Sequence, residues 1–168
     1  EPSVTMSKKS KARKSPTPDT AQMSDRHHLY ELSVQCSESE VDFVRTTFKK
    51  LRKRPARLLR EDFCGTANVC CEWVRKHRDN RAIGVDLDKE VLDWGTAHNL
   101  AKLSRGQRER VSLLCKDVLK ASTEPVDVVS AMNFSYWLLK DRKTLLRYFR
   151  RVLRALADDG VFFLDCYG

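Results

Sequence analysis

Hydrophobic positions between residues 56 and 166 change their spacing several times along the chain. Apolar runs of about four to eight residues predict buried strands, whereas apolar positions three and four residues apart predict amphipathic helices. Alternation of the two patterns is typical of a parallel sheet with helices on both faces, because the helix joining two parallel strands must cross over the sheet. The expected strands are 56–62, 81–87, 111–116, 126–132 and 161–166, and the helices expected between them are 66–77, 89–103 and 141–156.

A further helix is predicted before the first strand. Ser37 and Glu40 have the spacing of a capping box, and Pro55 marks the end of the apolar periodicity. The residues expected to face the core are Val41, Val44, Phe48 and Leu51 in this helix, Ala67, Cys70, Trp73 and Val74 in the second, Val91, Leu92, Trp94 and Leu100 in the third, and Leu145, Leu146, Phe149, Val152 and Leu153 in the last.

The composition of the chain changes near residue 25. Residues 1–24 are rich in Lys, Ser, Thr and Pro and offer few side chains to bury, so a disordered basic tail is expected there. Residues 25–55 form an expected N-terminal helical segment, and residues 56–168 the main domain. No apolar run reaches the roughly 18 residues of a membrane span, and no apolar secretory segment opens the chain. We therefore expect a cytoplasmic protein with no membrane partner.

Charged and sulfur-containing residues raise two separate questions. The formal net charge is +9, and residues 49–60 hold seven bases in twelve positions. Such a run can attract phosphate or an acidic partner, or it can be a solvated helix end whose charges favour the helix dipole. The six cysteines form no CxxC pair and lie mostly within apolar patterns, so we expect buried reduced thiols and no metal site.

Polar side chains follow the expected strands where each strand ends. Ligands of open α/β sheets bind beyond these carboxyl ends. Glu61 and a small-residue turn follow the first strand, Asp86 ends the second, and Asp117 follows the third. Asp86 is placed to accept from ribose hydroxyls and Asp117 from the exocyclic amine of adenine. Alternatively, Asp86 and Asp88 only cap the next helix and Asp117 only holds a turn.

The order of these motifs resembles class I S-adenosylmethionine-dependent methyltransferases. An acid and a small-residue turn are followed by GVDLD, CKDV, DVVSAMNFSYW and GVFFLDC, from about residue 56 to residue 168. The resemblance implies that Glu61 faces the methionine end of the cofactor and that Phe63, Gly65 and Ala67 occupy the three glycine positions of the family motif. Phe63 must keep φ below zero or be strained there, whereas Ala67 is expected to start the helix at little cost.

The same resemblance implies further site residues. Leu87 is expected to pack on adenine beside Asp86, and Asp117 and Val118 to meet its amine and ring edge. An upstream segment often closes over the cofactor in this family, which makes Tyr30 and Gln35 candidate lid residues. The aromatic residues after the fourth strand either line the acceptor cleft or only pack under the next helix. The expected cofactor-binding residues are Glu61, Phe63, Cys64, Gly65, Thr66, Asp86, Leu87, Asp117, Val118 and Asn133, and the substrate-cleft candidates are Phe134, Tyr136, Trp137 and Tyr30.

The resemblance also predicts a fold and an activity. The fold is α/β, a Rossmann-like three-layer sandwich with a mostly parallel sheet in the order 3-2-1-4-5, with the family's strands 6 and 7 missing. An uncovered fifth strand would favour self-association. The activity is methyl transfer from S-adenosyl-L-methionine by in-line displacement to an unidentified small molecule, RNA or protein, with no catalytic residue assigned. The alternative is a non-catalytic RNA-binding or assembly module. NAD is disfavoured because G-x-G-x-x-G is absent.

Overall fold

The computed structural model describes residues 36–166 as an α/β domain. All four strand pairings are parallel and the strand order is β3-β2-β1-β4-β5, which confirms the predicted fold class. In chain order the elements are α3 (Ser37–Arg52), β1 (Leu58–Asp62), α4 (Asn68–Lys76), β2 (Arg81–Asp86), α5 (Lys89–His98), the 3-10 helix η1 (Leu100–Lys102), α6 (Arg105–Arg108), β3 (Val111–Cys115), β4 (Val126–Ala131), the 3-10 helix η2 (Ser135–Leu138), α7 (Arg142–Ala155) and β5 (Leu156–Leu164).

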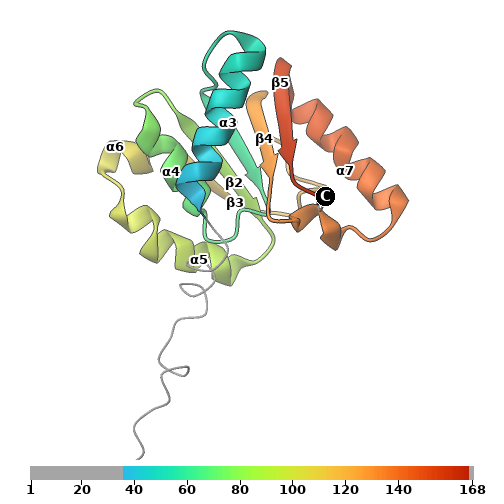
Figure 1. Cartoon of the computed structure of the whole chain (residues 1–168). Coiled ribbons are helices and arrows are strands. Elements are labelled where there is room, and N and C mark those ends of the chain that lie inside the picture. Colours follow the sequence, from blue (N-terminus) through green and yellow to red (C-terminus); the bar gives the residue numbers. More distant parts are fainter. Residues whose placement is uncertain (1–35, 167–168) are drawn as a thin grey trace, which may run out of the picture.

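Helices cover the two faces of the sheet and make three layers. The helices α3, α4 and α5 lie on one face and α7 on the other (Figure 1). Neighbouring residues of β1 point to opposite faces, as strand geometry requires, so Leu59 joins the core under α3 and α4 while Leu58 joins the core under α7. Because all strands are parallel, their carboxyl ends meet at one edge of the sheet, the lower edge in Figure 1. The order of strands reverses between β1 and β4.

A charged group lies inside the core under α7. The Arg60 Nε donates to Asp62 Oδ1 at 2.7 Å, and the Tyr148 hydroxyl donates to Asp62 Oδ2 at 2.9 Å. All three side chains are buried, and Arg60 Nη2 has no hydrogen-bond partner in the described part of the chain. Burial raises the pKa of the Asp62 carboxyl, although the Arg60 guanidinium opposes this shift. The stability of the core at the centre of the sheet therefore depends on the Arg60–Asp62 ion pair and on the hydrogen bond from Tyr148.

Several local predictions were wrong for identifiable reasons. The N-cap residue of α3 is Cys36, whereas the predicted capping box needs Ser37 in that position. No side chain forms a capping hydrogen bond, so the expected capping box does not form. In α7, Tyr148 is fully buried, whereas Leu146 and Leu153 are exposed. Leu146 and Leu153 were expected to be inward because they continue the apolar spacing, but the helix turns its Tyr148 side to the sheet. β5 begins at residue 156 instead of the expected 161. Its pairing with β4 changes register between Val126 and Val128 of β4.

The basic run at 49–60 does not form one surface. Arg54 pairs with Asp127 at 2.7 Å and with Asp159 at 2.6 Å, and Arg60 is buried, while Lys49 and Lys50 lie in the last turn of α3. The basic residues of this run therefore lie in different environments and do not act as one binding surface.

The expectation of buried cysteines holds for only half of them. Cys64, Cys70 and Cys71 are buried, but Cys36, Cys115 and Cys166 are exposed, and the described residues hold no group of three side chains able to bind a metal ion. All six thiols are free.

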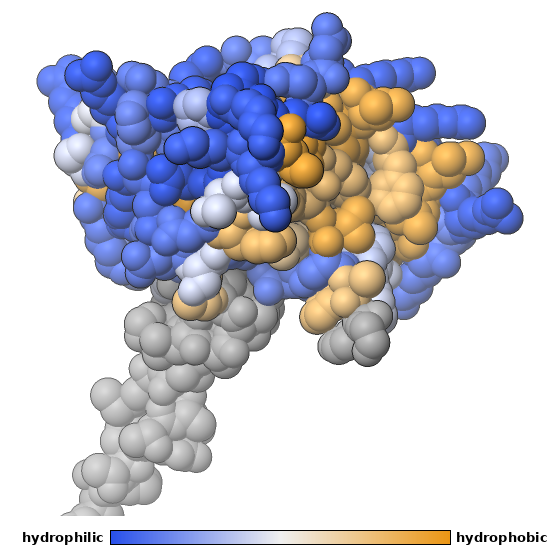
Figure 2. Space-filling view, turned by 45° about the horizontal axis from the view of Figure 1, so that its top comes forward, coloured by the Kyte–Doolittle hydropathy of each residue, from blue (hydrophilic) through white to orange (hydrophobic). Residues whose placement is uncertain are grey.

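The outer edge of the sheet is apolar on the β5 side. Within the described residues, β5 pairs only with β4. Figure 2 shows apolar side chains gathered on this side of the molecule. Phe43 of α3, Leu153 of α7 and Leu164 of β5 are exposed. Self-association through this edge stays a prediction. Between residues 36 and 166, no helix is long and apolar enough to cross a bilayer.

Candidate functional site

A cavity of about 580 Å³ opens at the carboxyl ends of β1 to β4. It lies where the strand order reverses, which is where open α/β sheets bind their ligands. Its walls come from the residues that follow four different strands. The lining residues are Phe63, Asp86, Leu87, Asp88, Asp117, Val118, Leu119, Ser135, Leu138 and Leu139.

Asp86 joins the first two loops of this cavity. The Gly65 N–H donates to Asp86 Oδ2 at 2.8 Å, and the Asp88 N–H donates to Asp86 Oδ1 at 2.9 Å. A carboxylate has about four acceptor positions, so two amide donors leave further acceptor capacity on Asp86, which lines the cavity. Asp88 in turn caps α5, where its side chain accepts from the backbone of Glu90 and Val91. Asp86 and Asp88 therefore both organise the backbone and line the cavity.

Asp117, which follows β3, lines the cavity together with apolar side chains. Its Oδ1 accepts from the Leu119 N–H at 2.8 Å, so the expected turn role is present alongside the place in the cavity. Val118 is buried, while Leu87 and Leu138 are 73% and 71% exposed and flank the opening. The cavity is thus an apolar slot with carboxylates on its walls.

The lining chemistry restricts the kind of ligand. Three of the ten lining residues are acidic and none is basic. A pyrophosphate would be repelled by this wall, whereas a nucleoside can donate hydroxyl and amine hydrogens to it. The cavity suits a nucleoside that carries no phosphate.

The loop after β1 has an unusual backbone. Phe63, Gly65 and Ala67 all have positive φ, at 59°, 52° and 58°. A non-glycine residue in this left-handed region costs roughly 1–2 kcal/mol. The strain expected of Phe63 is present, but the expectation that Ala67 is unstrained was wrong, because the chain enters α4 through a left-handed Ala67. The loop therefore has positive φ at all three positions where the family motif has glycine, although only Gly65 is a glycine.

Close packing against α5 supports this loop. A Cβ atom added at Gly95 would lie 2.3 Å from the Thr66 carbonyl oxygen, so only glycine allows α5 to approach so closely. The Asn99 side-chain amide donates to the same carbonyl at 3.1 Å. Cys64 points away from the cavity, and a Cβ atom added at Gly84 would lie 2.8 Å from its Sγ. The contacts of Thr66 with α5 and of Cys64 with Gly84 therefore hold the loop in place.

Carboxylates also collect on the other side of the loop. Glu61 is buried, and Cys70 Sγ donates to its Oε2 at 3.0 Å. Burial, and then the charge of Glu40 on α3, raise the pKa of Glu61 to about 8. Burial, and then the charge of Asp165, raise the pKa of Glu40 to about 7. These side chains hold negative charge poorly, so a cation bound nearby would stabilise their ionised forms.

We expect stability to fall as the pH rises through this range. A folded-state pKa above the unfolded value makes the native state bind more protons. The stabilisation is therefore complete below pH 4.5 and is lost progressively as the pH rises to about 8. From the value for Glu61, facing Cys70, Glu40 and Asp86, the free energy of unfolding should drop by roughly 2 kcal/mol between pH 6 and pH 8.5. Urea denaturation at several pH values measures this drop. Glu61→Gln should remove most of it, and equal slopes for both proteins would contradict the assignment.

A second strained turn follows β4. Asn133 and Phe134 have φ of 58° and 56°, and the Asp165 carboxylate accepts both of their N–H groups at 2.9 Å. Asp165, from the end of β5, was missed by sequence reasoning because no local pattern relates it to residue 133. It fixes the segment that leads into η2, where Tyr136 is half-buried and Trp137 is 49% exposed.

The structure brings only part of the predicted set into the cavity. Five expected residues line it: Phe63, Asp86, Leu87, Asp117 and Val118. The expected residues outside its lining are Glu61, Cys64, Gly65, Thr66 and Asn133, together with the cleft candidates Phe134, Tyr136 and Trp137. Tyr30 and Gln35 lie outside the described residues. Sequence reasoning missed five lining residues: Asp88, Leu119, Ser135, Leu138 and Leu139. The first four directly follow predicted site residues, and Leu139 follows Leu138.

Sequence comparison places the chain in a family. The family profile described as "Methyltransferase domain" matches residues 64–162, a span from the loop after β1 to the last third of β5. This chain belongs to that family. A search of curated protein sequences finds no match.

Solved methyltransferases have the same fold as this methyltransferase domain. The sugar N-methyltransferase KedS8 from Streptoalloteichus sp ATCC 53650 matches with a TM-score of 0.69 and 21% identity, over 98% of this chain and 60% of that one. CalS10, an amino pentose methyltransferase from Micromonospora echinaspora solved with bound SAM, gives 0.69 and 14%, over 94% and 60%. The glycopeptide N-methyltransferase MtfA gives 0.64 and 18%, over 76% and 53%. The chain therefore spans a little over half the length of these proteins.

Proposed function

We propose that this chain forms the cofactor-binding part of a methyltransferase that uses S-adenosyl-L-methionine. The observation that carries the proposal is the cavity lining, which combines apolar walls with three carboxylates and no basic side chain. The adenosine part of this cofactor offers hydroxyl and amine donors and a flat purine. In S-adenosyl-L-methionine, the adenosine part is bonded to a sulfonium cation at the position where a dinucleotide has a phosphate. Both the donors and the cation match an acidic slot.

Each wall of the cavity has a proposed role. Asp86 accepts from the ribose hydroxyls while its other contacts hold Gly65 and Asp88, and Asp117 accepts from the adenine amine. Leu87 and Val118 pack on the purine. The methionine part extends along the loop after β1. The residues proposed to contact or surround that part are Phe63, Cys64, Gly65, Thr66, Glu61 and Asn133.

The cluster of Glu61, Glu40 and Asp165 suits the cationic end of the cofactor. Raised pKa values of Glu61 and Glu40 mean that their ionised forms lack a compensating charge in the protein alone. A neighbouring sulfonium and α-ammonium would supply that charge. The bound cofactor supplies a methyl group activated by a sulfonium. The chain's part is to align donor and acceptor and to exclude water.

The acceptor is proposed to approach past the segment after β4. Phe134, Tyr136 and Trp137 lie there, on a backbone that Asp165 holds in place. We assign no general base, and the acceptor itself stays unidentified.

Calorimetric titration of S-adenosyl-L-methionine into the full chain tests the proposal. We expect micromolar binding that Asp86→Ala weakens about 100-fold, because hydrogen bonds to a charged group contribute roughly 1.5–3 kcal/mol each. Asp117→Ala should weaken it about 10-fold. Asp79→Ala, at an exposed turn away from the cavity, is the control and should leave affinity unchanged. Circular dichroism verifies that each variant is folded. Absence of binding by the folded chain, or equal affinity of all variants, would overturn the proposal.

A further inference from the structure

The outward face of α7 carries a dense set of basic side chains. Six of its fourteen residues are basic and none is acidic: Arg142, Lys143, Arg147, Arg150, Arg151 and Arg154. None of the six forms an ion pair within residues 36–166, unlike Arg54 and Arg60. Like charges three and four residues apart destabilise a helix, so this face is electrostatically costly in the protein alone.

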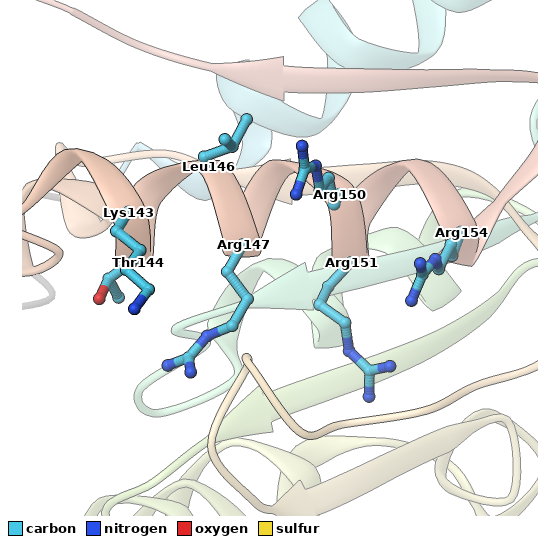
Figure 3. Close-up of a pocket in the computed structure, with 7 residues that line it drawn as sticks. All are labelled: Lys143, Thr144, Leu146, Arg147, Arg150, Arg151 and Arg154. Carbon is cyan, nitrogen blue, oxygen red and sulfur yellow. The ribbon is translucent and has the colours of Figure 1, made fainter.

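Five of these side chains form one stripe, which we call the α7 stripe: Lys143, Arg147, Arg150, Arg151 and Arg154. At 3.6 residues per turn they fall within an arc of about 100°. The centre of this arc lies about 110° from Tyr148 and about 150° from Val152 around the helix axis. Tyr148 and Val152 are buried against the sheet. Figure 3 shows Arg147 and Arg151 extending to the same side of the helix, with Leu146 and Arg150 toward its other edge. With Thr144 and Leu146, the stripe lines a surface hollow of about 500 Å³.

The stripe presents charges at regular intervals. Residues 143, 147 and 151 follow one another by four positions, which is a rise of about 6 Å each along the helix. Four of the five side chains are arginine, whose planar guanidinium donates two parallel hydrogen bonds to a phosphate. A row of cationic side chains at a constant interval, here Lys143, Arg147 and Arg151, suits a ligand with a repeating phosphate. We infer that the α7 stripe binds the phosphate backbone of a single-stranded nucleic acid.

The surroundings of the stripe favour a single strand over other polyanions. The segment just before α7 exposes about half of Trp137 and most of Leu138. Proteins that bind single strands combine a basic groove with aromatic side chains on which unpaired bases stack. The net charge of +9 adds long-range attraction for nucleic acid. A bilayer surface fits less well, because α7 has already buried its apolar face and leaves only Leu146 and Leu153 to insert. The inference does not depend on the proposed cofactor site.

Fluorescence anisotropy with a labelled 20-nucleotide single-stranded RNA of mixed sequence tests the inference on the full chain. We expect micromolar binding at low salt. Arg147→Gln/Arg151→Gln/Arg154→Gln should weaken it about 10-fold or more and lower the slope of log K against log salt by about 2, since each phosphate contact contributes roughly 0.7 for a single strand. The matched control Lys49→Gln/Lys50→Gln/Arg78→Gln removes the same charge from exposed sites elsewhere and should change affinity less than about 2-fold.

Further measurements separate the inference from its rivals. Single-stranded DNA of the same sequence should bind within a few-fold of RNA if the phosphate backbone is the ligand. Equal weakening by both triple variants would overturn the inference, as would tighter, stripe-dependent binding of polyglutamate or of vesicles containing phosphatidylserine. Failure of the full chain to bind either nucleic acid would also overturn it. Asp86→Ala should retain RNA binding, so failure of the cofactor proposal and failure of this one are distinguishable.

Discussion

Gly95→Ala is expected to destabilise the domain by about 3 kcal/mol or more. The added Cβ atom would lie 2.3 Å from the Thr66 carbonyl oxygen and 2.7 Å from its carbon, which are backbone atoms that no rotamer change can move. Either α5 or the loop after β1 must shift. Because that loop also donates Gly65 N–H to Asp86, the shift should weaken cofactor binding as well. Urea denaturation and calorimetric titration measure the two effects.

Gly106→Ala is the matched control. No atom lies within 4 Å of a Cβ added there, and the residue is in the short helix α6. Alanine is a better helix former than glycine, so the variant should be unchanged or slightly more stable. If Gly95→Ala is as stable as Gly106→Ala, the close approach of α5 to the loop is not required by the fold.

Asp62→Leu is expected to cost about 3–5 kcal/mol of unfolding free energy. It leaves the Arg60 guanidinium buried with no carboxylate, and arginine cannot lose its proton to relieve that cost. The Tyr148 hydroxyl also loses its acceptor. The same substitution at Asp93, whose pair with Lys89 is exposed, should change stability very little. Chemical denaturation of the two variants gives the comparison.

A combined variant distinguishes an unpaired charge from poor packing. Arg60→Met/Asp62→Leu/Tyr148→Phe replaces the ion pair and the phenol by apolar groups of similar volume, so most of the lost stability should return. If this triple variant is as unstable as Asp62→Leu alone, the cost comes from packing, and the buried charge is not its cause.

The apolar pattern predicted the order of strands and helices because it depends only on local geometry. A strand turns alternate side chains to opposite faces, and a helix repeats every 3.6 residues, so burial leaves a readable period in the sequence. The same reasoning placed Asp86 and Asp117 at strand ends, and both line the cavity. It was less successful for α7, where Leu146 and Tyr148 both fit an apolar face and only packing against the sheet decided between them.

Other features of the site could not be read from the sequence. The positive φ of Ala67 follows from the way α4 and α5 enclose the loop, because alanine by itself prefers a helical start at negative φ. Asp165 accepts from Asn133 across 32 positions, and Glu40 on α3 raises the pKa of Glu61 on β1. No local spacing relates such pairs.

The sequence alone therefore determined the α/β class, the order of the strands and helices and the acidic ends of β2 and β3. The tertiary structure decided the charge balance around the site, the strained loop after β1 and the division of the basic residues between ion pairs and the exposed face of α7. The physical reason is that periodicity is a property of neighbouring residues, whereas electrostatic fields, close approach and exposure depend on which distant segments meet.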